Sequence, residues 1–419
     1  MGNGGGETVP EVVSASGDSP QQTMRLIRPF YRSLGTVRVA RQVSGLHILF
    51  VGPTVCARHG FYANVHLHAD FISYLTTSLV DVAMGRVEEL TVAAAREVME
   101  RRRPRPEALM LDTGCEDELL CTDFEAIARA VEAACGVPTV HFGKNRMFVD
   151  GRGSFFPTFH RSLFGLLGPV DRDGRAWERD RGVNIIGSIS RLRPGGDFEE
   201  VLRAAGCGPV RTLKTARTFG EFCEMARSAV NVVIDDDYLE AARDMERRLG
   251  IPYIYRPVSY DLDEVGEMYE ELASLLGVRL DWRPRRDRAL RRLDEVLAGG
   301  SSGAGGIGSA GGSDKSGGPE PFALYGVGIA DPWSCAEALA SRGLPVRSLT
   351  VMLEDEPDER GRRALASLTA RNPSFTVERY DYKGNMPVVA ELGPLEPEFY
   401  GFAAFEHMLD LVVGGRDYS

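Results

Sequence analysis

The sequence is poor in several features that would assign a function directly. Only 7 of its 419 residues are cysteine, too few for a disulfide scaffold in a chain of this length, and the odd number leaves at least one thiol unpaired. No apolar run approaches the length of a membrane span, and residues 1–22 lack the apolar core of a signal peptide. We therefore expect a reduced, cytoplasmic protein.

Positive charge is also scarce. The chain has 49 lysines and arginines against 60 aspartates and glutamates, a formal net charge of −11. This balance argues against nucleic acid as a partner. No Gly-Lys-Ser or Gly-Lys-Thr triplet occurs, so the Gly/Ser-rich run Gly299–Gly318 is not a phosphate loop, and its composition is typical of a flexible linker.

What the sequence does contain is an alternation of short apolar runs and amphipathic stretches. The runs Leu46–Val51 and Ala108–Leu111 predict buried strands, and the spacing of apolar residues in Val87–Arg101 and Asp123–Cys135 predicts helices. The same rhythm restarts twice further along the chain. Strands that alternate with helices form parallel sheets, so we predict an α/β protein of three tandem units.

Two of the predicted strands lead into a cysteine. A Gly-Pro pair stops the first strand shortly before Cys56, and the second strand ends in Asp112-Thr113-Gly114-Cys115. The carboxyl ends of parallel strands meet at one edge of a sheet, where open α/β sheets place ligands. Thiolates are the ligands of iron–sulfur clusters, so the two cysteines could share a metal cluster. The alternative is that each is a small buried apolar residue.

Other side chains have alternative interpretations. His59 follows Cys56 closely and is either a ligand or proton donor or a residue with local hydrogen bonds. The run Asp235–Asp237 follows a predicted strand and either binds a hard cation or leaves Asp237 to cap the next helix. The remaining cysteines lie on predicted helices or at their ends, where we expect packing roles: Cys135, Cys207, Cys223 and Cys335.

Four segments occur in an order and approximate spacing that together carry a resemblance. They are Gly52–Cys56, Ile72–Ser78 with the following Asp81, Gly85 and Glu89–Leu90, then Asp112–Phe124, and finally Val183–Gly187 with Ala226–Asp235 and Gly250–Tyr253. This pattern resembles the nitrogenase component 1-like superfamily. That superfamily comprises dinitrogenase subunits, their cofactor-scaffold relatives, protochlorophyllide reductase subunits and the nickel-tetrapyrrole reductive cyclase.

The resemblance implies a fold of three tandem Rossmann-like parallel-sheet domains of the nitrogenase component 1 type. On this basis we expect a disordered tail over 1–23, a first α/β domain with the cluster-cysteine loops over 24–180, a second α/β domain and following helix over 181–298, a Gly/Ser-rich flexible linker over 299–320, and a third α/β domain over 321–419.

The resemblance also implies a site, with two departures from the family pattern. Cys56 and Cys115 match cluster cysteines, whereas Tyr74 stands where the family has its second cysteine and Cys121 stands where a glycine is usual. A 4Fe-4S cluster could still form if two copies each supplied Cys56 and Cys115 across a two-fold axis. The partner across the cluster is a second copy or a paralogous subunit. We therefore expect metal ligands among Cys56, Cys115 and Cys121, with the catalytic residues unassigned.

The function implied by the resemblance is an oxidoreductase subunit. It would hold the cluster at a subunit interface and pass low-potential electrons to a bound substrate, fed by a separate ATP-hydrolysing iron protein, with no nucleotide in this chain. An alternative within the superfamily is a scaffold that assembles or transfers a metal cofactor without turnover. A third hypothesis is a non-catalytic α/β binding module in which both cysteines are structural.

Overall fold

The protein is described from a computed structural model. The structure describes residues 36–37, 39–54, 56–57, 70–114, 120–143, 156–171, 173–187, 192, 196–299, 321–325, 331–352, 357–380 and 400–414. The predicted tail, residues 300–320 of the Gly/Ser-rich linker, His59 and Cys115 lie outside the described residues, whereas Gly299 is the last residue of a helix.

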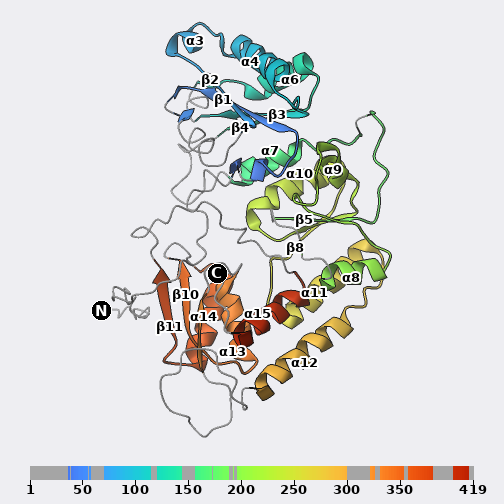
Figure 1. The fold of residues 1–419 in the computed structure, drawn as a ribbon, viewed down its shortest axis with the longest axis vertical. Helices are drawn as coiled ribbons and strands as arrows, with labels where there is room; N and C mark the ends of the chain where they lie inside the picture. Colours follow the sequence, from blue (N-terminus) through green and yellow to red (C-terminus); the bar gives the residue numbers. More distant parts are fainter. Residues whose placement is uncertain are drawn as a thin grey trace, which may run out of the picture.

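The described strands form three parallel sheets that follow one another along the chain (Figure 1). The first has the order β2-β1-β3-β4 and the second β6-β5-β7-β8, whereas the third has the order β11-β10-β9. The strands are β1 (Leu46–Gly52), β2 (Ile72–Thr76), β3 (Ala108–Thr113), β4 (Thr139–Gly143), β5 (Val183–Ile186), β6 (Val210–Arg211), β7 (Val230–Val233), β8 (Tyr253–Tyr255), β9 (Phe322–Tyr325), β10 (Val346–Met352) and β11 (Thr376–Tyr380). The prediction of an α/β protein with parallel sheets is confirmed.

Helices connect the strands and cover the sheets. They are α3 (Leu79–Ala83), α4 (Val87–Arg101), α6 (Phe124–Cys135), α7 (Phe156–Gly165), α8 (Asp197–Ala204), α9 (Phe219–Cys223), α10 (Leu239–Leu249), α11 (Leu262–Leu276), α12 (Arg283–Gly299), α13 (Pro332–Ser341), α14 (Glu359–Arg371) and α15 (Phe402–Gly414), with short 3-10 helices η1 (Glu224–Arg227) and η2 (Asp236–Tyr238). None of the described helices is both long and apolar enough to cross a membrane.

The ends of α6 show why the sequence fixes its bounds. The Asp123 carboxylate accepts a hydrogen bond from the Ala126 N–H at 2.9 Å, which satisfies one of the N–H groups left open at a helix start. At the other end Gly136 adopts a left-handed backbone with φ of 70°, a conformation that suits glycine and ends the helix. These two residues therefore determine where α6 begins and where it ends.

The first sheet is covered on both faces. Leu49 and Leu111 point to the face packed by α4 and α6, whereas Ile48 and Met110 point to the opposite face. On that opposite face α7 packs against β4 and also against α10 of the second unit (Figure 1). Helices α7 and α10 thus lie between the first two sheets, α7 against the first and α10 against the second.

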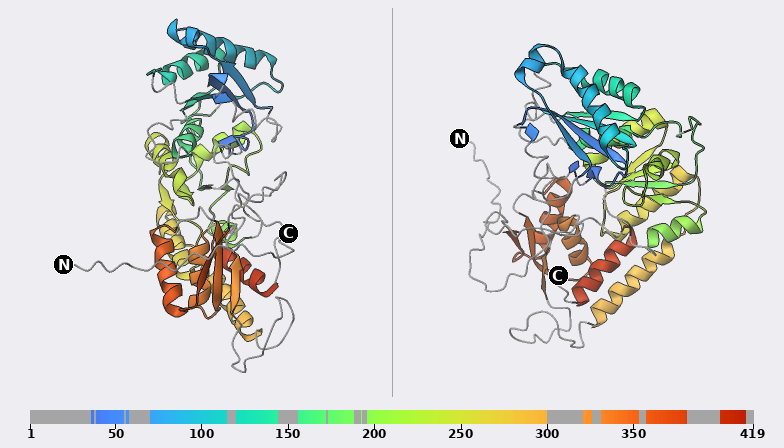
Figure 2. Two further views of the ribbon diagram at one scale, coloured as in Figure 1. Left: turned by 90° about the vertical axis from the view of Figure 1, so that its left-hand side faces the viewer. Right: turned by 45° about the horizontal axis from the view of Figure 1, so that its top comes forward.

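The second and third units share a continuous core. It runs from β5 and β7 through α8, α11 and α12 to the third sheet, and α15 packs against α12, α11 and α8. Figure 2 shows the first and third sheets at opposite ends of the molecule, with the second unit between them. The domain bounds expected from the sequence remain a prediction.

Candidate metal-binding edge

The first candidate ligand, Cys56, lies at the carboxyl edge of the first sheet. β1 ends at Gly52, and Cys56 follows on a short helical turn whose Cys56 N–H donates to the Pro53 carbonyl oxygen at 3.0 Å. The Cys56 side chain is half-buried. Its placement directly after β1 agrees with the sequence prediction, and its role as a ligand remains a prediction.

The segment after β3 carries the other two candidate thiols. β3 ends at Thr113, and Cys115 lies outside the described residues. Cys121 is exposed and has a φ of 51°, in the left-handed region. That region suits glycine and is strained for other residues by about 1–2 kcal/mol. The left-handed backbone at Cys121 explains why a glycine was expected at this position.

Tyr74 lies on the same sheet in the row of residues just before the edge. Tyr74 is paired with Phe50 across β2 and β1, and Phe50 is paired with Asp112 across β1 and β3. Burial, together with the Asp112 carboxylate, raises the pKa of Tyr74 to about 12. The phenol is therefore protonated at neutral pH and is a poor replacement for a thiolate ligand.

His141 is a member of this edge that the sequence reasoning missed. Its Nε2 lies 2.9 Å from Thr113 Oγ1, its ring stacks on Phe124 with centroids 5.1 Å apart, and its Nδ1 lies 3.7 Å from Glu125 Oε1. Burial lowers the pKa of His141 to about 4, so the imidazole is neutral at neutral pH. A histidine on a short strand next to the cysteine segment was the only sequence signal for it.

At the second sheet the expected role of Asp237 is wrong. The Asp235 carboxylate accepts a hydrogen bond from the Asp237 N–H at 2.9 Å, so Asp235 caps η2, and no side chain caps the start of α10. Burial raises the pKa of Asp235 to about 7. Asp235 is the cap because the 3-10 helix η2 begins directly after it, ahead of α10.

His160, on α7, is a second buried histidine that was missed. Its Nδ1 lies 3.1 Å from the Asp237 carbonyl oxygen, and its ring stacks on Tyr238 with centroids 3.5 Å apart. The contacts join α7 to η2 and so join the first two units. The packing role expected for Cys135, Cys207 and Cys335 is confirmed, since all three are buried, and Cys223 is half-buried against the core between the first two sheets.

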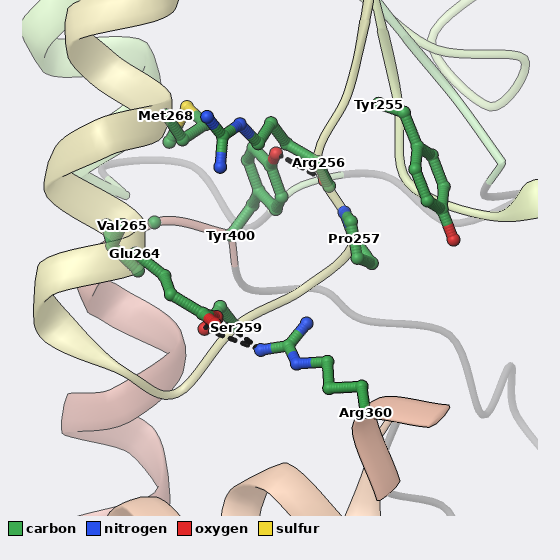
Figure 3. Close-up of a pocket in the computed structure, with 10 residues that line it drawn as sticks. Tyr255, Arg256, Pro257, Ser259, Glu264, Val265, Met268, Arg360 and Tyr400 are labelled. Atoms are coloured by element: carbon green, nitrogen blue, oxygen red, sulfur yellow. Dashed lines mark hydrogen bonds and ion pairs between the residues drawn. The ribbon is translucent and has the colours of Figure 1, made fainter. Parts of the chain in front are cut away.

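A cavity of about 120 Å³ lies between the second and third units (Figure 3). Arg360 reaches from α14 to Ser259 Oγ at 3.0 Å and to Glu264, and the Tyr400 hydroxyl donates to the Arg256 carbonyl oxygen at 2.8 Å. Arg256 in turn pairs with Glu271 at 2.7 Å. Both guanidinium groups therefore have carboxylate partners. The contacts of Arg360 and of the Tyr400 hydroxyl join the third unit to the second.

The donor set at the cysteine edge fits an iron–sulfur cluster by its chemistry, because thiols are the side chains such clusters need. Within the part of the chain that the structure describes, no group of three His, Cys, Asp or Glu side chains could hold a metal ion. A cluster at this edge would therefore need ligands from the segment that carries Cys115, from a partner subunit, or from both.

The sequence of residues 32–300 matches the family of nitrogenase component 1 type oxidoreductases. The match covers more than half of the chain, and the chain belongs to this family. Three successive parallel sheets with a cysteine edge on the first are consistent with that membership.

Two curated relatives are nitrogenase iron-molybdenum cofactor biosynthesis proteins NifE. The one from Klebsiella pneumoniae is 23% identical over 294 residues, which cover 68% of this chain and 61% of the relative. The one from Sinorhizobium fredii is 27% identical over 239 residues, which cover 53% of this chain and 45% of the relative. The matched regions thus span about half to three fifths of these relatives.

A solved structure supports the fold alone. The structure of nitrogenase Cp1 at pH 6.5 superposes with a TM-score of 0.59 at 10% sequence identity, and the alignment covers 95% of this chain and 94% of that one. At this identity the likeness says nothing about substrate or chemistry.

Proposed function

We propose that this chain is a scaffold subunit that holds a metal cofactor during its assembly or transfer. The observation that supports it best is that both curated relatives are cofactor biosynthesis proteins. A scaffold needs a site that binds a metal group and a surface for the proteins that deliver and receive it. The cysteine edge of the first sheet supplies candidates for the first requirement.

At this edge we propose an iron–sulfur cluster, of the 4Fe-4S type, between two subunits. Cys56 and Cys115 of this chain would be ligands, and a second copy or a paralogous subunit would supply the others. Cys121 is the further thiol on the same segment. Thiolates bind the irons and remain deprotonated because of them, and the cluster would supply single electrons at low potential.

Exposed apolar side chains near the same edge support a partner subunit. α3 directly follows β2 and has no buried residue, with Leu79 89%, Val80 63% and Met84 68% exposed. Leu120, next to Cys121, is 50% exposed. Large apolar side chains gathered on a surface are typical of protein interfaces. We propose that α3 and Leu120 are covered by the subunit that completes the cluster.

A second candidate function is electron transfer to a substrate, and the family description as oxidoreductases favours it. In that case an ATP-hydrolysing iron protein would dock, donate an electron and leave, and this chain would be a catalytic subunit. The two functions differ in what the cluster does. A scaffold gives up metal to an acceptor, whereas an oxidoreductase retains it and consumes ATP only when substrate is present.

The test is anaerobic purification of the full chain with its co-purifying subunit, followed by iron and sulfide analysis and electron paramagnetic resonance. We expect a cluster signal that Cys56→Ala and Cys115→Ala remove, whereas Cys335→Ala, at a fully buried cysteine remote from the edge, retains it. Iron-55 that moves to an apo-acceptor protein would support the scaffold. A metal-free assembly with both cysteines reduced would overturn both functions and leave a non-catalytic α/β binding module.

A further inference from the structure

The segment that carries two of the candidate thiols begins and ends beside one side chain. It leaves β3 after Thr113, passes Cys115 and Cys121, and enters α6 at Phe124. Thr113 and Phe124 are both buried, and both contact His141 of the neighbouring strand β4. The imidazole therefore joins the two ends of this segment.

At the first end the contact is a hydrogen bond. Thr113 is fully buried, and its Oγ1 lies 2.9 Å from His141 Nε2. The two residues lie diagonally across β3 and β4, because Thr113 is paired with Gly143 and Leu111 is paired with His141. A buried hydroxyl without a partner is unfavourable, so this bond fixes the direction of the Thr113 side chain.

At the second end the contact is a ring stack. The Phe124 and His141 rings lie 5.1 Å apart at 19°, and Glu125 Oε1 is 3.7 Å from the other ring nitrogen, Nδ1. Gly143 borders both side chains, since a Cβ at that position would be in van der Waals contact with His141 Cε1 at 3.4 Å and with Thr113 Oγ1 at 3.6 Å. The ring is thus held on several sides.

We propose that His141 is a positioning residue that ties the end of β3 at Thr113 to the start of α6 at Phe124 and thereby sets where Cys121, three residues before α6, lies relative to the sheet. Two elements tied to one rigid group have fewer relative arrangements, which lowers the cost of placing a ligand between them. The ligand role of that thiol rests on the function proposed above, whereas the tie between β3 and α6 does not. Neutral imidazole at physiological pH agrees with a bond to an uncharged hydroxyl.

The hydrogen bond between Thr113 and His141 can be removed from either side. Thr113→Val keeps the size of the side chain and removes the hydroxyl, and His141→Phe keeps a stacking ring and removes the nitrogen. His47 provides a matched control, because it is a buried histidine of the same sheet whose Nε2 lies 2.9 Å from Ser73 Oγ. Burial, with a smaller contribution from Arg102, lowers its pKa to about 4 as well, but it lies at the opposite end of β1 from Cys56.

The experiment measures amide hydrogen exchange across Leu111–Ala128 in the full chain without metal. We expect a rise in exchange of about threefold to tenfold in Thr113→Val and His141→Phe, the range for one lost hydrogen bond, and no local change in His47→Phe. Unchanged exchange in both edge variants, or an equal rise in the control, would overturn the proposal.

A second measurement tests whether the Thr113–His141 contact affects metal binding. In anaerobically isolated protein, we expect Thr113→Val to change the line shape of the cluster signal and to lower iron content by at least about twofold, with the His47→Phe signal as in the wild type. A wild-type protein without iron would remove the proposed function, and the exchange data would still decide the role of His141. A cluster signal that none of these variants alters would show that the tie does not position a ligand.

Discussion

The Asp197 carboxylate, at the start of α8, accepts a hydrogen bond from the Phe402 N–H at the start of α15, across 205 residues of sequence. The same carboxylate accepts a second bond from the Ala403 N–H at 2.9 Å and a third from the Tyr269 hydroxyl at 2.8 Å. Asp197 is fully buried. A negative side chain at the start of a helix satisfies open N–H groups and suits the helix dipole.

Replacement of this carboxylate should be among the most destabilising changes in the protein. Asp197→Ala leaves three buried donors without their acceptor, so we expect a loss of about 3–5 kcal/mol in the free energy of unfolding. Urea titration followed by circular dichroism measures it. Asp261→Ala, which removes a cap at the more exposed start of α11, should cost only about 1 kcal/mol. Equal losses in the two variants would contradict the role given to burial.

At Cys121 we predict a substitution that raises the free energy of unfolding. Because its backbone is left-handed, Cys121→Gly should raise the free energy of unfolding of the metal-free protein by about 1 kcal/mol, whereas Cys121→Ala should leave it nearly unchanged. Chemical denaturation of both variants tests this. If the glycine variant gains no stability, the strain at this position is relieved in another way. Iron content of the same pair, measured after anaerobic isolation, reports whether the thiol is a ligand.

Three histidines, of which His47 and His160 are buried and His141 is half-buried, predict the response of the fold to acid. Burial is the main cause that lowers the pKa of His47, His141 and His160 from 6.5 to about 4. Between these values the unfolded chain binds more protons than the folded one. The stability that each neutral imidazole contributes is therefore present above pH 6.5 and is lost as the pH falls toward 4.

From pH 7 to pH 5 we expect a loss on the order of 1–2 kcal/mol for each histidine, in the absence of compensating groups. Thermal unfolding followed at several pH values measures the slope. His47→Gln has no imidazole to protonate and should show a flatter dependence than the wild type. A melting temperature that is constant across this range would contradict the neutral state of the three side chains.

The exposed helix α3 predicts a loss of assembly without a loss of fold. Val80→Glu places a charge among the exposed apolar side chains proposed to meet a partner, and it should weaken the subunit association by about tenfold or more. Light scattering of the purified assembly over a dilution series measures the change. Leu275→Glu is the control, since Leu275 is 42% exposed on α11, outside the first sheet. An unchanged assembly in Val80→Glu would exclude α3 from the interface.

Much of the fold could be predicted because its signals are local. The bounds expected for Val87–Arg101 are those of α4, and Asp123 and Gly136 fixed α6 through cap chemistry. α7 was missed because it is short and its buried face carries two aromatic residues and a histidine, Phe159, His160 and Phe164, instead of an aliphatic stripe; it packs between the first sheet and α10. β11 was missed because it is a short edge strand that carries two charged residues, Glu378 and Arg379, instead of an apolar run.

The candidate site also has features that the sequence predicts and features that it does not. The position of Cys56 after a strand could be predicted from a Gly-Pro stop, since that signal lies within a few residues. His141 could not, because its contacts to Thr113 and Phe124 exist only after β3, β4 and α6 have packed together. Whether a thiol binds metal depends in addition on groups outside a single chain, which no spacing within it reveals.

The packing of α15 has a consequence for synthesis on the ribosome. Phe402 and Phe405 are fully buried in the core that the second and third units share, beside α8, α11 and α12. The middle of the protein therefore cannot close its own interior until residues near 410 have emerged from the exit tunnel. Nascent chains that pause before that point would present this open core to chaperones or to one another.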